Sequence, residues 1–144
     1  MGFLSYSQAF RTFGAKLRNP LWAYSAVADD GAVVISCWNH KLKLLDGVLT
    51  YTDRISRWDA NAPGKKLLID HLTRAQNQAL PIRLVIATTD QPDVVDRGEE
   101  ARGLYKTFHT KQDVVGSVAS FDGDQFVLEF RRPQPANSGP TTPA

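Results

Sequence analysis

Hydrophobic residues near the N-terminus recur at roughly helical spacing, and serines stand where they could cap a helix. This pattern predicts an amphipathic helix over residues 6–17, ended by Asn19-Pro20 because proline disfavours helical geometry in the residue before it. A second apolar stripe, with i, i+3, i+4 spacing over residues 64–79, predicts another helix that ends before Pro81. The sequence thus predicts two main helices.

The clearest strand signal comes from two runs rich in β-branched and aromatic residues, 21–28 and 32–38. They flank Asp29-Asp30-Gly31, which is typical of a three-residue hairpin loop with its glycine in the left-handed conformation. Counting back from this loop places Tyr24 opposite Ser36. The same count places Trp22 opposite Trp38 on that face of the hairpin.

This aromatic face has two interpretations. The first is core, packed beneath the first helix, because large aromatic side chains bury well. The second is a binding pocket, because the Tyr24 hydroxyl and the indole N–H groups of Trp22 and Trp38 need polar partners when buried. The sequence leaves both interpretations open.

Three further strand regions follow. Asp46-Gly47 predicts a hairpin over residues 41–52, and Asp122-Gly123 predicts another within residues 114–130. The apolar run 82–89 is typical of a buried strand, whereas residues 90–103 read as a polar loop or a broken helical turn. Few helices among many strands predict an α+β fold with a curved, mostly antiparallel sheet.

Length and composition agree with one folded domain. The chain has 144 residues, enough to bury a core without disulfides or metals. We expect residues 1–132 to form a single globular domain. The remaining residues, 133–144, are rich in Pro, Ser, Thr and Gly and are expected to form a disordered tail or linker.

Charge and cysteine content exclude several protein classes. The net charge of +2 is too small to indicate nucleic-acid binding by itself, so any basic surface must be local. The single cysteine cannot form an internal disulfide, which favours a cytoplasmic location. No run approaches the roughly 20 apolar residues that a membrane-spanning helix needs. We therefore expect no membrane association.

Catalytic patterns have little support. Cys37 and His40 lie three residues apart, and on a strand this offset points their side chains to opposite faces. Asp93 and Glu129 are weak candidates for a metal-dependent hydrolase, because the element that would complete the motif is absent. His71, on the apolar stripe of the second helix, is expected to be a hydrogen-bonded core residue. The sequence predicts no catalytic residue, no bound metal and no cofactor.

A binding surface is better supported. Residues 41–66 contain six cationic side chains with Trp58 between them. Cations bind phosphates and aromatic rings stack on exposed bases, so this combination is typical of nucleic-acid sites. Lys65 and Lys66 also begin the second helix, whose N-terminal amides favour an anion. A solvated charged face is the alternative interpretation.

The segment 17–129 resembles a domain found N-terminal to HNH nucleases in bacterial restriction-like proteins, which also occurs in small stand-alone proteins. The matching residues are Asn19, Trp22, Tyr24, Gly31, Val33 and Trp38, with Asn39 near an acidic position of the pattern. Tyr24 stands where that pattern has a second tryptophan, and no HNH motif follows. The resemblance implies a DNA-reading module, with modified bases as one class of target and a nuclease subunit or domain as a partner.

Three functions remain in view at this stage. The first is a DNA-binding module of a restriction or defence system, without a catalytic site of its own. The second is a small phage or mobile-element protein that uses its acidic loop, 90–100, to bind a protein partner. The third is the hydrolase. The candidate nucleic-acid-binding residues are Trp22, Tyr24, Ser36, Trp38, Asn39, His40, Lys41, Lys43, Arg54, Arg57, Trp58, Lys65 and Lys66.

Overall fold

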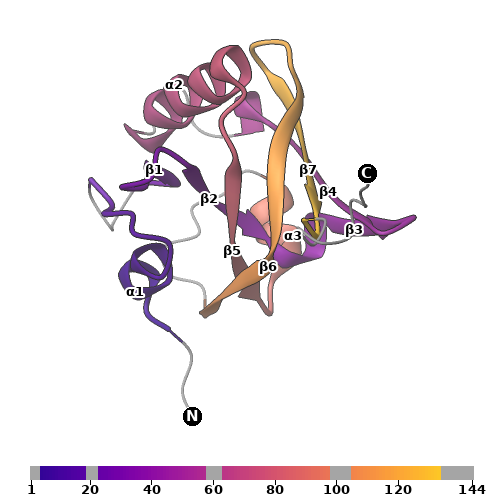
Figure 1. Cartoon of the computed structure of the whole chain (residues 1–144). Coiled ribbons are helices and arrows are strands. Elements are labelled where there is room, and N and C mark those ends of the chain that lie inside the picture. The colour runs from indigo at the N-terminus through magenta and orange to yellow at the C-terminus, as the bar shows by residue number, and fades with distance from the viewer. Residues whose placement is uncertain (1–3, 19–22, 58–62, 98–104, 134–144) are drawn as a thin grey trace.

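The computed structural model describes residues 4–18, 23–57, 63–97 and 105–133 (Figure 1). The strands are β1 (Ser25–Val27), β2 (Val33–Trp38), β3 (Leu42–Leu45), β4 (Val48–Arg54), β5 (Ile82–Thr89), β6 (Lys106–Phe121) and β7 (Gln125–Arg131). The helices are α1 (Tyr6–Arg11), α2 (Pro63–Gln78) and α3 (Pro92–Asp96), with short 3-10 turns η1 (Asn39–Lys41) and η2 (Ile55–Arg57). From residue 134 on, the predicted disordered tail lies outside the described residues.

All the strands join one sheet in the order β1-β2-β5-β6-β7-β4-β3. The β2–β5 pair is parallel, and the other five neighbouring pairs are antiparallel. The fold is therefore α+β with a curved, mostly antiparallel sheet, which confirms the predicted fold class.

The three predicted hairpins form as expected. In the first, Ser25 pairs with Ile35 and the Ser36 N–H donates to Tyr24 O at 3.0 Å, so Tyr24 lies opposite Ser36. Gly31 has a φ of +90°, which confirms the predicted left-handed glycine. The β3–β4 turn places Asp46 and its neighbouring glycine at positive φ, as a two-residue primed turn requires. Trp22, which the same register places opposite Trp38, lies outside the described residues.

The helices agree with the prediction less well. α2 forms over nearly the predicted range, but α1 ends at Arg11 instead of continuing to residue 17. Ser5 caps α1, and Gln8 completes a reciprocal capping box. Gly14 then has a φ of +76° and Ala15 forms a β-bridge to Ala28. Pairing with the first hairpin has replaced the helical turn that apolar spacing alone predicted.

Strand β6 curls the sheet. Its first half pairs with β5 and its second half with β7, with register shifts in both pairings. Such irregularities raise the local twist of a strand. As a result, β7, β4 and β3 continue the sheet away from the β1-β2-β5 end (Figure 1).

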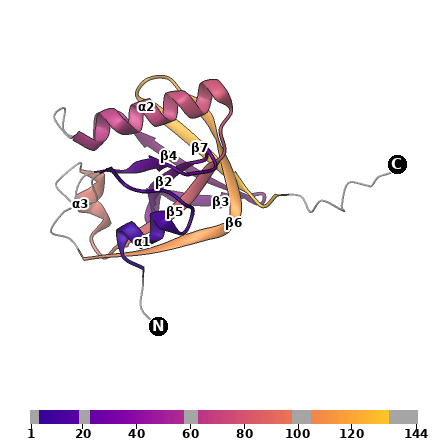
Figure 2. The same cartoon turned by 60° about the vertical axis from the view of Figure 1, so that its left-hand side comes forward.

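The two faces of the sheet are covered differently. One face carries the larger core, in which Leu68 and Leu72 of α2 cluster with residues of β2, β5, β6, β7 and β4, whereas α1 lies on the other side of the sheet (Figure 2). α1 covers the β1-β2-β5 end of the other face and the start of β6: Phe10 packs with Val34 and Val85, and the Tyr6 ring centroid lies 4.8 Å from that of Phe108. Burial on both sides explains why β2 and β5 read as continuous apolar runs. Among the described residues, no helix lies over the β7-β4-β3 part of the α1 face, although the end of α3, at Asp96, borders it.

Candidate nucleic-acid interface

The uncovered part of the α1 face contains a shallow groove formed by two neighbouring hollows of about 460 Å³ each. Lys41, Thr52 and Asp96 line both hollows, which makes them continuous. We call this surface the basic groove; it is lined by His40, Lys41, Lys43, Leu45, Thr50, Thr52, Asp53, Arg54, Ser56, Asp96, Arg97 and Gln125.

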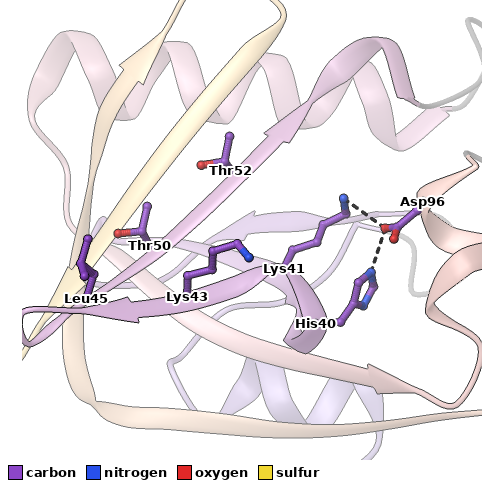
Figure 3. Close-up of a pocket in the computed structure, with 7 residues that line it drawn as sticks. All are labelled: His40, Lys41, Lys43, Leu45, Thr50, Thr52 and Asp96. Atoms are coloured by element: carbon purple, nitrogen blue, oxygen red, sulfur yellow. Dashed lines mark hydrogen bonds and ion pairs between the residues drawn. The ribbon is translucent and has the colours of Figure 1, made fainter.

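Strand alternation sets the floor of the basic groove. Along β4, Tyr51 is buried in the α2-facing core, so Thr50 and Thr52 point to the opposite face. Lys43 of β3 is the direct cross-strand partner of Thr50 and therefore shares its face. Figure 3 shows these side chains along the two strands. Short hydroxyl side chains keep this floor low and leave room beside the longer cations.

Turn η1 and helix α3 border the basic groove where its two hollows meet. The ring Nε2 of His40 lies 2.9 Å from Asp96 Oδ1, and Lys41 Nζ lies 3.2 Å from the same oxygen (Figure 3). The hydrogen bond from His40 and the charge of Lys41 lower the pKa of the Asp96 carboxyl below its usual value. Asp96 is half exposed, so solvent screens these pairs and keeps them weak.

Arg54 marks one end of the basic groove, and Lys43 and Leu45 line the other. Its guanidinium donates to Asp124 Oδ2 at 3.1 Å and to the Gln125 side chain at 2.9 Å. Asp124 also accepts from the backbone and hydroxyl of Ser56, and these hydrogen bonds, followed by Arg54, lower the pKa of its carboxyl. The β6–β7 turn therefore holds Arg54 in place while leaving its side chain largely exposed.

The electrostatic balance of the basic groove is positive. Four lysine and arginine side chains line it against two carboxylates. Lys41, Arg54 and Arg97 each have an acidic partner, whereas Lys43 is exposed and has no ion pair within the described part of the chain. Lys43 could bind an anion at a lower free-energy cost than the other three cations, because it has no ion pair to break.

The structure brings only some of the predicted site residues together. His40, Lys41, Lys43 and Arg54 all line the basic groove. Lys65 and Lys66 begin α2, which packs on the opposite face of the sheet, so the sheet separates them from the groove. Trp58 lies outside the described residues, and so does the side chain of Arg57.

The predicted aromatic face is divided. Around its middle it is core, because Phe10 of α1 packs on Ala26 and Val34. The buried Tyr6 hydroxyl donates to Ala23 O at 2.7 Å, and burial raises the pKa of this phenol. Tyr24 and Ser36 are half-buried beside this cluster.

Trp38 lies nearer the basic groove. It is half-buried, packs against the α2-facing core, and its ring centroid lies 6.2 Å from that of His40. Asn39 follows it as an exposed residue of η1. Neither Trp38 nor Tyr24 lines the two hollows. An aromatic recess on this face therefore stays a prediction.

Several groove residues were absent from the sequence-based set, above all the two threonines, Asp96, Arg97 and Gln125. The alternation of buried and polar positions in β4 was a usable signal for Thr50 and Thr52. Asp96 gave no such signal, because 56 residues separate it from His40 in the chain.

Catalytic alternatives find little support in the geometry. Cys37 is fully buried, and burial raises the pKa of its thiol well above the usual value, which disfavours a nucleophilic thiolate. Asp93 is paired with Arg97, and Glu129 with a neighbouring arginine. Within the described ranges, no three His, Cys, Asp or Glu side chains cluster closely enough to hold a metal.

A buried Ser–His pair is present but is not an active site. Ser25 Oγ lies 2.7 Å from His71 Nδ1, which confirms that His71 is a hydrogen-bonded core residue. The Ser25 side chain has no solvent exposure, so a substrate cannot reach its hydroxyl. Desolvation lowers the pKa of His71 and keeps the ring neutral near pH 7. The pair connects α2 to β1.

Among the described helices, none combines the length and apolarity that crossing a membrane requires. Comparison of the chain with protein-family models, curated proteins and solved structures finds no match. The resemblance to the HNH-associated domain therefore stays a prediction.

Proposed function

We propose that the protein is a DNA-binding module that holds backbone phosphates in the basic groove. The observation that carries this proposal is an uncovered sheet face with Lys41, Lys43 and Arg54 aligned along it. Phosphate contacts position a protein on DNA and give an affinity that depends strongly on salt. The threonine floor adds hydroxyl donors of the kind that also contact phosphate oxygens.

Reading of modified bases is the finer part of the proposal. Trp38 is a partly exposed aromatic side chain beside His40, and a base outside the stack is commonly held by such a ring. A role in restriction or defence rests on the sequence resemblance. No catalytic step is proposed for the basic groove.

The test is a fluorescence anisotropy titration of plain and modified duplex DNA at several salt concentrations. Replacing Lys41 and Lys43 together by alanine should weaken binding to every duplex. The slope of log K against log salt should become shallower by roughly 2, since each lost phosphate contact removes about 0.9. Asp96→Asn should act in the opposite direction and tighten binding, because it removes a carboxylate that competes with phosphate for Lys41.

The matched control is the double substitution of Lys65 and Lys66 by alanine. It removes the same charge from the opposite face of the sheet, so the salt slope should stay close to that of the wild type. If both double variants lost the same DNA affinity and the same salt dependence, net charge, and not the basic groove, would govern binding. A wild type that binds no duplex at low salt would overturn the proposal in favour of a protein partner.

A further inference from the structure

Strand β3 is an open edge of the sheet. It pairs with β4 on one side and has no strand on the other side among the described residues. The opposite edge is closed differently: Ala15 bridges Ala28, and the Asp29 N–H donates to Gly14 O at 3.0 Å. Within the described part of the chain, the β3 edge is therefore the more open of the two edges to another strand.

The register of the β3–β4 hairpin shows which backbone groups face this edge. Its two-residue loop lies between Leu45 and Val48, which form the hydrogen-bonded pair that closes such a turn. Because such pairs alternate along an antiparallel ladder, Leu44 directs both its N–H and its C=O away from β4. The Leu42 N–H, two residues earlier, also faces outward and donates to Asn39 O within η1.

The side chains of the same strand are unusually apolar for a solvent-exposed edge. Leu44 is 74% exposed and Leu45 is 71% exposed, and they point to opposite faces. The hairpin that carries them projects from the body of the molecule (Figure 1). Single exposed leucines are ordinary, but two in succession on an unpaired edge strand are typical of a strand-pairing surface.

We propose that β3 pairs antiparallel with β3 of a second copy of this chain, centred on Leu44. In this register the outward N–H of Leu44 donates to the C=O of the partner's Leu44, and the reverse bond forms by symmetry. A two-fold axis normal to the sheet generates this pair, so the contact is closed and self-complementary. The Leu44 side chain then packs against Leu44 of the second copy.

The same symmetry provides a contact for the exposed Leu45 and extends the sheet from one copy into the other. Leu45 lies beside the partner's Lys43, whose aliphatic stem covers it while the ammonium group stays in water. Since the axis is normal to the sheet, both basic grooves lie on one face of a continuous double-length sheet. Because β3 has only four residues, its pairing should bury far less than the roughly 1,200 Å² of stable complexes, and we expect a weak dimer that forms at raised protein concentration.

The test is sedimentation velocity over a wide concentration range with a charge-swap pair. The wild type should sediment as a concentration-dependent monomer–dimer mixture. Leu44→Lys alone and Leu44→Glu alone should each weaken self-association about tenfold or more, because each places two like charges opposite one another. Mixing the two variants should restore a dimer, which a misfolded variant could not do. Tyr105→Lys, at another exposed hydrophobic residue, is the matched control and should dimerise like the wild type.

A wild type that stays monomeric at every concentration would overturn the inference. A dimer unaffected by either Leu44 variant would overturn it too. This outcome is independent of the DNA titration, which is read at concentrations where the monomer prevails.

Discussion

Gly116, in the middle of β6, should not tolerate even a methyl group. A Cβ added there would lie 2.5 Å from Phe130 Cδ1 and 3.0 Å from the backbone oxygen of Glu129. Carbon atoms in contact normally lie about 3.5–4.0 Å apart. Phe130 is the direct cross-strand partner of Gly116 and is fully buried, so its ring cannot move aside without disturbing the core.

We therefore expect Gly116→Ala to lower the free energy of unfolding by about 1–3 kcal/mol, the usual cost of overpacking a core. Alanine also has an intrinsic advantage over glycine within a strand of roughly 0.5–1 kcal/mol, and the clash must exceed it. In urea, a loss of about 2 kcal/mol moves the unfolding midpoint down by roughly 1 M for a protein of this size.

The assay is urea unfolding monitored by tryptophan fluorescence, with Phe130→Leu as the second arm of a double-mutant cycle. The smaller side chain should relieve the clash, so Gly116→Ala should cost less in that background. Ser117→Ala, on the exposed neighbour, is the control and should change little. A midpoint that is unchanged in Gly116→Ala, or an equal cost in both backgrounds, would refute the reasoning.

Two further predictions concern buried polar groups. Because burial lowers the pKa of His71 from 6.5, the unfolded chain binds a proton at a higher pH than the folded protein. The free energy of unfolding should therefore fall as the pH drops below about 6.5, until the folded-state pKa is passed. His71→Gln should remove this part of the pH dependence in denaturation curves between about pH 8 and pH 5; an unchanged slope would assign it to other groups. Tyr51→Phe removes the 3.0 Å hydrogen bond from the Tyr51 hydroxyl to the buried Asp53 and should cost about 1–3 kcal/mol. Thermal and urea unfolding measure that loss, and a cost near zero would mean that water replaces the donor.

Local chemistry accounts for what the sequence predicted correctly. The three hairpins could be assigned from their turn residues, at Gly31, 46–47 and 122–123. Turn type and strand register follow from a few adjacent residues. α2 was equally accessible, since its apolar stripe repeats over many residues. α1 was predicted too long because its last apolar residue, Leu17, is buried by contact with the sheet and not by a helical stripe.

The candidate site was only partly accessible for the same reason. Lys41, Lys43 and Arg54 come from one continuous segment, and its cations were visible in the sequence. Their separation from Lys65 by the thickness of the sheet was not visible, because it depends on which face α2 covers. In the folded protein, the cations of this one segment therefore lie on two different surfaces.

Local turns and periodicities, then, were determined by the sequence alone, because they depend on interactions between residues close together in the chain. The strand order β1-β2-β5-β6-β7-β4-β3, the parallel β2–β5 pair and the contact of His40 with Asp96 were decided only by the tertiary structure. Each of these joins segments that are distant in sequence. Such pairings gain their free energy from the simultaneous burial of both sheet faces, to which the whole chain contributes.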